Sequence, residues 1–186
     1  MSYVFDPDVL HEIAKEAVGL PFDEMVRKVV TDLDAAYPGH IDTDPTWAFS
    51  IWGGSTGHIG LLHASLSEYV LIYGTPIGTM GFSGRYLLEI HDFVISGTMW
   101  TCTEECFGEG VVTGPGGGAF LPRGKAKACK FSENNWMLEY ARGPIVTCLP
   151  YGLSEAIISA QDVPTVAKTV WAFGRCVVRE LLRGKI

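Results

Sequence analysis

Short runs of β-forming residues separated by glycines dominate the middle of the chain. From about residue 46 to residue 148, segments rich in Val, Ile, Phe, Tyr, Trp and Thr alternate with glycines such as Gly74, Gly97 and Gly108. Short runs with frequent turn signals are typical of antiparallel strands. We therefore expect residues 46–148 to form a sandwich or a small β-barrel, which can enclose one ligand.

Helical patterns flank this β-rich segment. Residues 1–45 hold two amphipathic patterns, the first opened by Asp6-Pro7 and the second ended by Pro38-Gly39. Two more run from about Tyr151 to Gln161 and from Pro164 to Leu182. With 186 residues and no repeat or linker, the chain favours a single domain, residues 1–186, made of a helical lead-in (1–45), a β-barrel (46–148) and C-terminal helices (149–186). The expected fold class is mainly β with flanking helices (α+β).

The last helical pattern carries a cationic stripe. Its members recur seven, four and four residues apart on an otherwise apolar helix: Lys168, Arg175, Arg179 and Arg183. This pattern suits a helix lying at a membrane interface. It suits equally a terminal helix that caps the barrel with solvated arginines. No apolar stretch reaches the roughly 18 to 20 residues of a spanning helix, so we expect peripheral membrane contact.

The composition narrows the classes of partner. Hydrophobic residues make up 47% and charged residues 19%, which indicates a large interior or apolar surface for membrane or subunit contact. The net charge of −7 and 14 scattered Lys and Arg argue against a nucleic-acid partner. The five cysteines have no framework spacing and no signal peptide precedes them, which predicts reduced thiols facing the cytosol.

The potential metal ligands do not converge in the sequence. Cys102 and Cys106 lack a second ligand pair, and structural zinc needs four ligands. His58, His63 and Glu68 recur every five residues, which scatters them over different faces of a strand or helix. We therefore predict no metal.

Two acidic residues stand inside strongly apolar strand patterns. Asp92 lies within residues 87–95 and Glu139 within residues 136–140. Alternate residues of a strand share a face, so Leu88, Ile90 and Val94 point with Asp92, and Met137 and Ala141 with Glu139. If these faces are interior, two carboxyls enter an apolar cavity and share a proton. The alternative is that either acid pairs with Arg85 or Arg142 at the barrel rim.

Long motifs carry a family resemblance over nearly the whole chain. LLHASLSEYVLIYGT (61–75), SGRYLLEIHDFVISGT (83–98) and WMLEYARG (136–143) resemble the family that unites fungal sterol carbon-8 isomerases with the animal sigma-1 receptor. The opening YVFDPDVLHEI (3–13) and the later CLPYGL (148–153) resemble the isomerase branch.

The resemblance implies a cupin-like β-barrel around an elongated hydrophobic ligand, two C-terminal helices on the membrane, and a homotrimer. By position Glu139 matches the catalytic and ligand-anchoring glutamate, and Asp92 matches its acidic partner in the receptor. Fungal isomerases carry that acid slightly earlier, so Glu89 is the alternative second acid. The matching ligand-binding positions are Tyr69, Leu71, Tyr73, Leu61, Ile59, Tyr86, Ile90, Ile145, Leu149 and Phe173, and we add the nearby aromatic Phe131.

Departures from the family pattern affect anchoring and ligand shape. Family members usually begin with a spanning helix, whereas this sequence begins almost at the YVFDP opening, so we expect attachment through the C-terminal helices. Ser55, Cys129 and Gly152 stand where the family has bulkier pocket residues, which should change the shape of the ligand.

Two functions follow from the resemblance. The first is an isomerase that moves a sterol double bond from carbons 8 and 9 to carbons 7 and 8 without a cofactor, by protonation, a carbocation steadied by Tyr69, Tyr86 or Phe131, and deprotonation. The second is a non-catalytic, sigma-1-receptor-like binder in which Glu139 pairs with the ammonium of an amphiphilic amine. Another polycyclic lipid could also be the ligand. We favour the isomerase, attached to the endoplasmic reticulum membrane if the source is eukaryotic.

Overall fold

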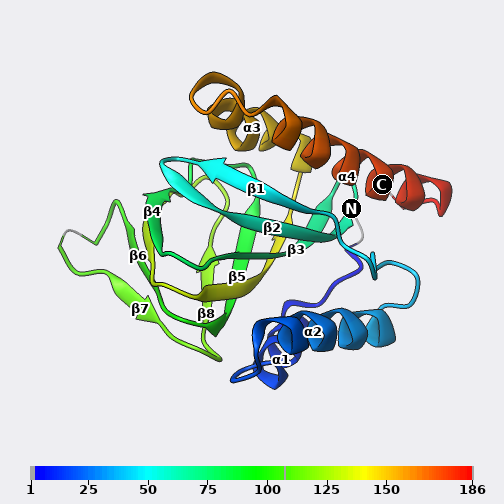
Figure 1. The fold of residues 1–186 in the computed structure, drawn as a ribbon, viewed down its shortest axis with the longest axis horizontal. Helices are drawn as coiled ribbons and strands as arrows, with labels where there is room; N and C mark the ends of the chain where they lie inside the picture. The colour runs from blue at the N-terminus through cyan, green and yellow to red at the C-terminus, as the bar shows by residue number, and fades with distance from the viewer. Residues whose placement is uncertain (1–2, 107, 186) are drawn as a thin grey trace.

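The computed structural model describes residues 3–106 and 108–185, so residues 1, 2, 107 and 186 of the expected single domain lie outside the described part. Helices α1 (Pro7–Glu16) and α2 (Phe22–Ala36) come first. The strands follow as β1 (Trp47–Trp52), β2 (Ser55–Ala64), β3 (Glu68–Thr75), β4 (Thr79–Phe82), β5 (Glu89–Ser96), β6 (Met99–Thr103), β7 (Val111–Thr113), β8 (Gly118–Leu121), β9 (Lys127–Phe131) and β10 (Asn135–Arg142). A short 3-10 helix (Ile145–Thr147), α3 (Leu149–Ile158) and α4 (Val163–Leu182) end the chain. The expected mainly β fold with flanking helices is confirmed (Figure 1).

The strands form two antiparallel sheets rather than one continuous barrel. The larger sheet has the order β1-β2-β3-β10-β5-β8, and the smaller one has the order β4-β9-β6-β7. Helices α1 and α2 lie on one side of the strands, and α3 and α4 lie on another side (Figure 1). The two sheets therefore enclose a space between them, and residues of α3 and α4 also line this space.

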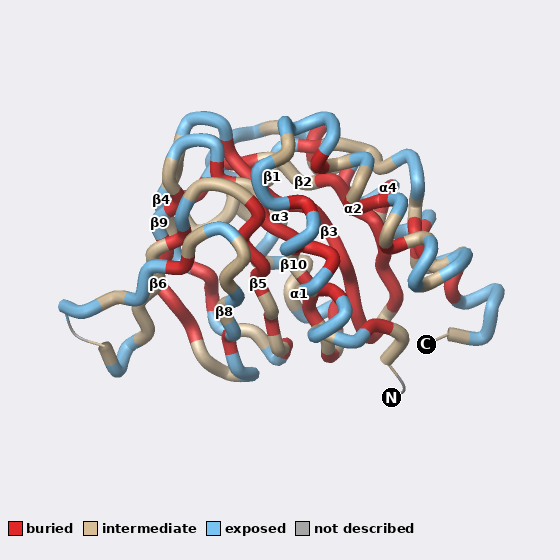
Figure 2. The backbone as a smooth tube through the Cα atoms, turned by 90° about the horizontal axis from the view of Figure 1, so that it is seen from below, coloured by how far each residue is buried: buried red, intermediate tan, exposed pale blue. Residues whose placement is uncertain are grey.

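The central strands of the larger sheet are buried on both faces. One set of alternate residues packs with α1 and α2: Val70 and Ile72 on β3, Phe93 and Ile95 on β5, Leu138 and Tyr140 on β10. The other set faces the space between the sheets, including Tyr69, Leu71, Ile90, Val94 and Met137. Figure 2 shows buried backbone along β3 and β5. Double-sided burial explains why these strands are almost continuously apolar in the sequence.

The local start signals of the helices work as the sequence predicts. The Asp6 side chain caps α1 by accepting a hydrogen bond of 2.9 Å from the amide of Asp8, and Pro7 occupies the first turn. Asp162 caps α4 in the same way, accepting from the amide of Thr165 at 3.1 Å. Helix α3 begins at Leu149, two residues before the predicted start, because Pro150 is accommodated in its first turn.

Two arginines of the cationic stripe of α4 bind protein groups. Arg175 forms an ion pair with Asp42, and Arg179 donates hydrogen bonds to the carbonyl oxygens of His40 and Ile41, at 2.8 and 3.3 Å. Large apolar residues of α4 are exposed beside the cations: Val163, Val170, Trp171, Val178, Leu181 and Leu182. The stripe is thus partly paired with protein groups and partly exposed, because Lys168, Arg175 and Arg183 keep contact with solvent. No helix within residues 3–106 and 108–185 is long and apolar enough to cross a membrane.

Glu68 joins both ends of the chain to the larger sheet. Its carboxylate is fully buried and accepts hydrogen bonds from the amide of Val4 at 2.8 Å and from the hydroxyl of Tyr140 at 2.9 Å. The ammonium of Lys185 lies 2.8 Å away. A buried carboxylate is tolerated only with this degree of pairing.

We predict that Glu68→Gln destabilises the protein by about 3 kcal/mol, because it removes the negative charge that compensates the largely buried Lys185 ammonium. Urea unfolding followed by circular dichroism measures the loss. The exposed Glu133 supplies the control, since Glu133→Gln should change stability by less than about 0.5 kcal/mol. An unchanged urea midpoint for Glu68→Gln would show that the network contributes nothing to stability.

Candidate functional site

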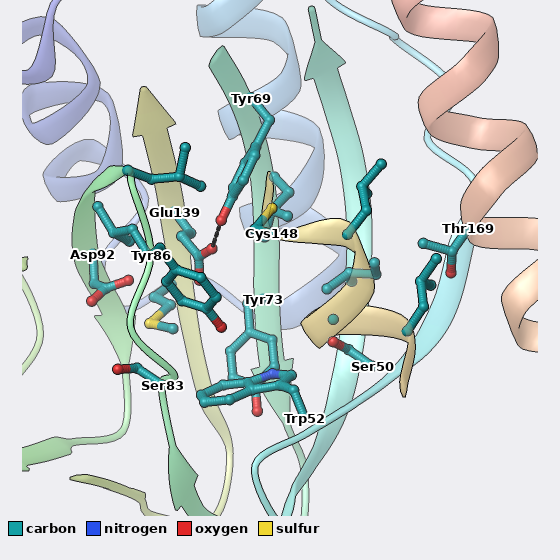
Figure 3. Close-up of a pocket in the computed structure, with 18 of the residues that line it drawn as sticks. Ser50, Trp52, Tyr69, Tyr73, Ser83, Tyr86, Asp92, Glu139, Cys148 and Thr169 are labelled. Atoms are coloured by element: carbon teal, nitrogen blue, oxygen red, sulfur yellow. Dashed lines mark hydrogen bonds between the residues drawn. The ribbon is translucent and has the colours of Figure 1, made fainter. Parts of the chain in front are cut away.

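A cavity lies between the two sheets and beneath the C-terminal helices. It contains about 900 Å³ of empty space including its open mouth, and its walls are mainly aliphatic and aromatic (Figure 3). The larger sheet supplies most of the wall, while α3 contributes Leu149, Gly152 and Leu153, and α4 contributes Thr169 and Phe173. A concave apolar space with few polar groups is the usual form of a small-molecule site.

Asp92 and Glu139 enter this cavity side by side. They are direct partners in the antiparallel ladder between β5 and β10. Both line the cavity, and their strand neighbours on the same face are the apolar residues Ile90, Val94, Met137 and Ala141. The strand alternation thus brings two carboxyls to one place.

Glu139 is the carboxyl that gains a proton near neutral pH. Withdrawal from water raises its pKa to about 7, and the negative charge of Asp92 acts in the same direction. The Tyr69 hydroxyl, which donates a 2.6 Å hydrogen bond to Glu139 Oε1, and the Lys127 ammonium both act to lower it. Glu139 keeps intermediate solvent exposure because it faces the cavity. At neutral pH it can therefore either donate or accept a proton.

Lys127 is a charged residue of the cavity that the sequence analysis missed. Its side chain is 9% exposed and its ammonium contacts the Asp92 carboxylate, whose side chain is 2% exposed. Burial by itself lowers the pKa of Lys127, but the charge of Asp92 and the hydrogen bond to it raise that pKa above its usual value. The alternation of Lys127, Cys129 and Phe131 as the buried positions of β9 is the signal that could have found it.

Most expected ligand-binding residues line the cavity. Besides the two acids, these are Ile59, Tyr69, Leu71, Tyr73, Tyr86, Ile90, Phe131, Leu149 and Phe173. Leu61 and Ile145 are buried in the same hydrophobic cluster but are not among the residues that line the cavity. Of the three positions with smaller residues, Gly152 lines the cavity, Ser55 lies 2.8 Å from the Tyr73 hydroxyl, and Cys129 is buried. The lining also includes Ser50, Trp52, Ser83, Leu88, Met137, Cys148, Leu153 and Thr169.

The alternative partners for the acids are engaged elsewhere. Arg142 pairs with Glu89 at 2.7 Å, and Arg85 pairs with Glu104 at 2.7 Å. Glu89 precedes the inward-facing Ile90 and does not line the cavity. The rim ion pair considered for Asp92 and Glu139 is therefore not formed by either arginine. The geometry also separates Glu89 from Glu139, so we take Asp92 as the second acid.

A cluster of His40, His63 and Glu180 lies apart from the cavity, with potential metal-binding atoms within 4.8 Å of one another. The sequence analysis did not associate these residues, because 140 positions separate His40 from Glu180. Arg179 Nε and Arg183 Nη1 lie 3.5 and 3.9 Å from the Glu180 carboxylate. These guanidiniums supply the positive charge that a metal ion would bring. We therefore interpret the cluster as a set of ion pairs that holds α4 against the segment containing His40.

A family model and two relatives match this chain over almost its full length. The model of the family described as "ERG2 and Sigma1 receptor like protein" matches residues 1–185. The "Protein erg2 homolog" of Dictyostelium discoideum is 39% identical over 180 residues, covering 95% of this chain and 76% of the relative. The "Sigma non-opioid intracellular receptor 1" of Xenopus tropicalis is 39% identical over 183 residues, covering 96% and 81%.

Solved structures of cupins show partial likeness. An RmlC-like cupin from Shewanella frigidimarina matches with a TM-score of 0.45 and 15% identity, over 54% of this chain and 85% of the other. A protein titled a predicted oxalate decarboxylase, from Thermotoga maritima, matches with a TM-score of 0.45 and 11% identity, over 55% and 96%.

We predict that Glu139 titrates with an apparent pKa of about 7, because it is withdrawn from water beside the charge of Asp92. Carboxyl carbon NMR of glutamate-labelled protein measures this value, and Glu139→Gln identifies the resonance by removing it. Since the folded-state pKa is raised, ionisation should cost stability as the pH rises from about 4.5 to about 7, relative to Glu139→Gln. A Glu139 resonance that titrates at the ordinary value near 4.5 would contradict the prediction.

Proposed function

The chain belongs to the ERG2 and Sigma1 receptor like protein family, and from that premise we propose that it is a sterol isomerase. The reaction is the transfer of a double bond from carbons 8 and 9 to carbons 7 and 8. The observation that carries the proposal is a carboxyl with a pKa of about 7 beside a second, ion-paired carboxylate in an apolar cavity. An unactivated alkene needs an acid, a base and exclusion of water, which these groups provide.

In the proposed mechanism protonated Glu139 donates its proton to carbon 9 of the alkene. The electron pair of the double bond forms the new C–H bond, which leaves a tertiary carbocation at carbon 8. A carboxylate then removes a proton from carbon 7, and the electrons of that C–H bond form the new double bond. The Asp92 carboxylate, which pairs with Lys127, lies opposite Glu139 in the ladder and is therefore placed to act as this base.

Aromatic residues surround the space where the cation would form. Trp52, Tyr73 and Phe131 form one group, with ring centroids 5.8 Å apart for Trp52 and Tyr73 and 5.3 Å apart for Tyr73 and Phe131. Tyr86 lines the cavity closer to the acids (Figure 3). The faces of aromatic rings attract cations, and this attraction supports a carbocation intermediate. No step requires a cofactor.

A second candidate function is the binding of a cationic amphiphile without turnover. It is favoured by the name of the Xenopus relative, a receptor, and by the position of Glu139, whose ionised form could pair with an ammonium. A protonated amine resembles the carbocation in charge, so the same acid serves both functions. Turnover of a sterol separates the two candidates, whereas binding of an amine does not.

We also propose that α3 and α4 attach the protein to a membrane surface, that of the endoplasmic reticulum in a eukaryotic cell. Large apolar side chains on these helices are exposed, with Ile158 at 77%, Trp171 at 70% and Leu182 at 84%. Such a surface is stabilised when it enters the boundary between lipid headgroups and acyl chains. The homotrimer remains a prediction of the family resemblance. Light scattering of the detergent-solubilised protein measures the number of subunits and so tests this prediction.

We predict that the wild-type protein converts an 8(9)-unsaturated sterol to its 7(8)-isomer and that Glu139→Gln lowers the rate at least about 100-fold, since a positioned general acid contributes that much. Mass spectrometry coupled to chromatography measures the product. Glu89→Gln is the matched control, because Glu89 does not line the cavity, and it should keep activity. If the wild type binds an amine through Glu139 but yields no isomer, the second candidate function replaces the first.

We predict that replacing both Ile158 and Trp171 by glutamate lowers binding to phosphatidylcholine vesicles at least about tenfold, because two charges would enter the apolar boundary. Vesicle co-flotation measures the bound fraction. The control is Val112→Glu on β7, where the side chain is 63% exposed on the smaller sheet. Equal flotation of the double variant and the control would exclude α3 and α4 as the attachment surface.

A further inference from the structure

Lys127 changes the charge of the cavity in a way that the proposed reaction does not by itself require. Its side chain crosses from the smaller sheet to Asp92 on the larger sheet. Ser83 holds its backbone on both sides: the Lys127 amide donates to the Ser83 hydroxyl at 2.9 Å, and the Ser83 amide donates to the Lys127 carbonyl at 2.9 Å. Both lysine and aspartate line the same cavity as Glu139. The ion pair is therefore part of the binding surface.

The charges of this surface favour one class of ligand. Asp92 and Lys127 cancel, so the three groups together are neutral when Glu139 is protonated and carry one negative charge when it is ionised. Without Lys127 the same cavity would carry one more negative charge in either state. A carboxylate already engaged by a buried ammonium offers a ligand cation little attraction, and the ammonium itself repels that cation.

We propose that Lys127 is a specificity-determining residue, which occupies Asp92 and thereby makes the cavity prefer uncharged polycyclic lipids over their protonated-amine counterparts. The inference rests on the proposed function, since it defines the substrate class of that site. Lys127 affects the ligand in two ways: its charge repels a ligand cation, and its ion pair with Asp92 reduces the attraction of that carboxylate for the cation. It donates no proton in the proposed reaction, so it is a positioning residue. It also distinguishes between the two candidate functions, which Asp92 and Glu139 alone do not.

The preference is measured as the ratio of two dissociation constants. The probes are an azasterol, which carries a protonated ring nitrogen, and the sterol with carbon in the same position. Quenching of tryptophan fluorescence reports binding, because Trp52 lines the cavity. We expect Lys127→Gln to raise the affinity for the azasterol at least about tenfold and to change the affinity for the carbon sterol less than about threefold. Lys127→Arg, which keeps the charge, should leave the ratio as in the wild type.

Asp92 supplies the matched control, because the effect should depend on exposing its charge. In Asp92→Asn/Lys127→Gln the ratio should return to within about threefold of the wild type. An unchanged ratio in Lys127→Gln overturns the inference, as does an azasterol gain that persists fully in the double variant.

Circular dichroism shows whether Lys127→Gln folds with its carboxylate uncompensated. If it does not, Asp92→Asn is compared with the double variant. In Asp92→Asn the Lys127 ammonium has lost its carboxylate partner and repels the azasterol. The double variant lacks this ammonium, so it must bind the azasterol at least about tenfold more tightly than Asp92→Asn does. Equal affinities of the two variants overturn the inference. These are equilibrium measurements, so absence of sterol turnover would defeat the proposed function while leaving the ratio intact.

Discussion

The structure depends on the burial of β10 on both of its faces between β3 and β5. Because side chains alternate along a strand, Leu138 and Tyr140 pack under the N-terminal helices while Met137 and Glu139 enter the cavity. A shift of one residue in the register would exchange these sets and place Glu139 beneath α1. The pairing of Glu139 with Asp92 across the ladder follows from the same register. The register of β10 therefore determines both the core packing and the position of the two acids.

Two acids facing one apolar space would strongly resist ionisation together, and the structure resolves this with unequal partners. Asp92 contacts an ammonium, whereas Glu139 accepts a hydrogen bond from the neutral hydroxyl of Tyr69. The pair that the sequence suggests would share one proton becomes an ion-paired carboxylate beside a carboxyl whose pKa is about 7. The two acids therefore have unequal surroundings, which is the condition that lets neighbouring carboxyl groups take different roles.

Local sequence patterns predict the fold and part of the site, and their failures share a cause. Strand alternation places Ile90, Asp92 and Glu139 on interior faces, and the capping residue Asp6 locates the start of α1, because both depend on neighbours in sequence. The partners of those residues lie far away along the chain. Lys127 is 35 positions from Asp92, and His40 is 140 positions from Glu180. No periodicity reports such pairings, so the charge balance of the cavity and the anchoring of α4 required the structure.

Helix α4 links the candidate site to the protein surface. Phe173 lines the cavity with its ring 6.1 Å from that of Tyr69, whose hydroxyl donates to Glu139. The same helix is held in place by the buried carboxylate of Glu180 and by Arg179 bound to the carbonyl of His40, whereas its exposed side presents Trp171. Ion pairs therefore hold in place the helix that contributes Phe173 to the cavity wall, so the shape of the candidate site depends on contacts made at the opposite end of the helix from Asp162.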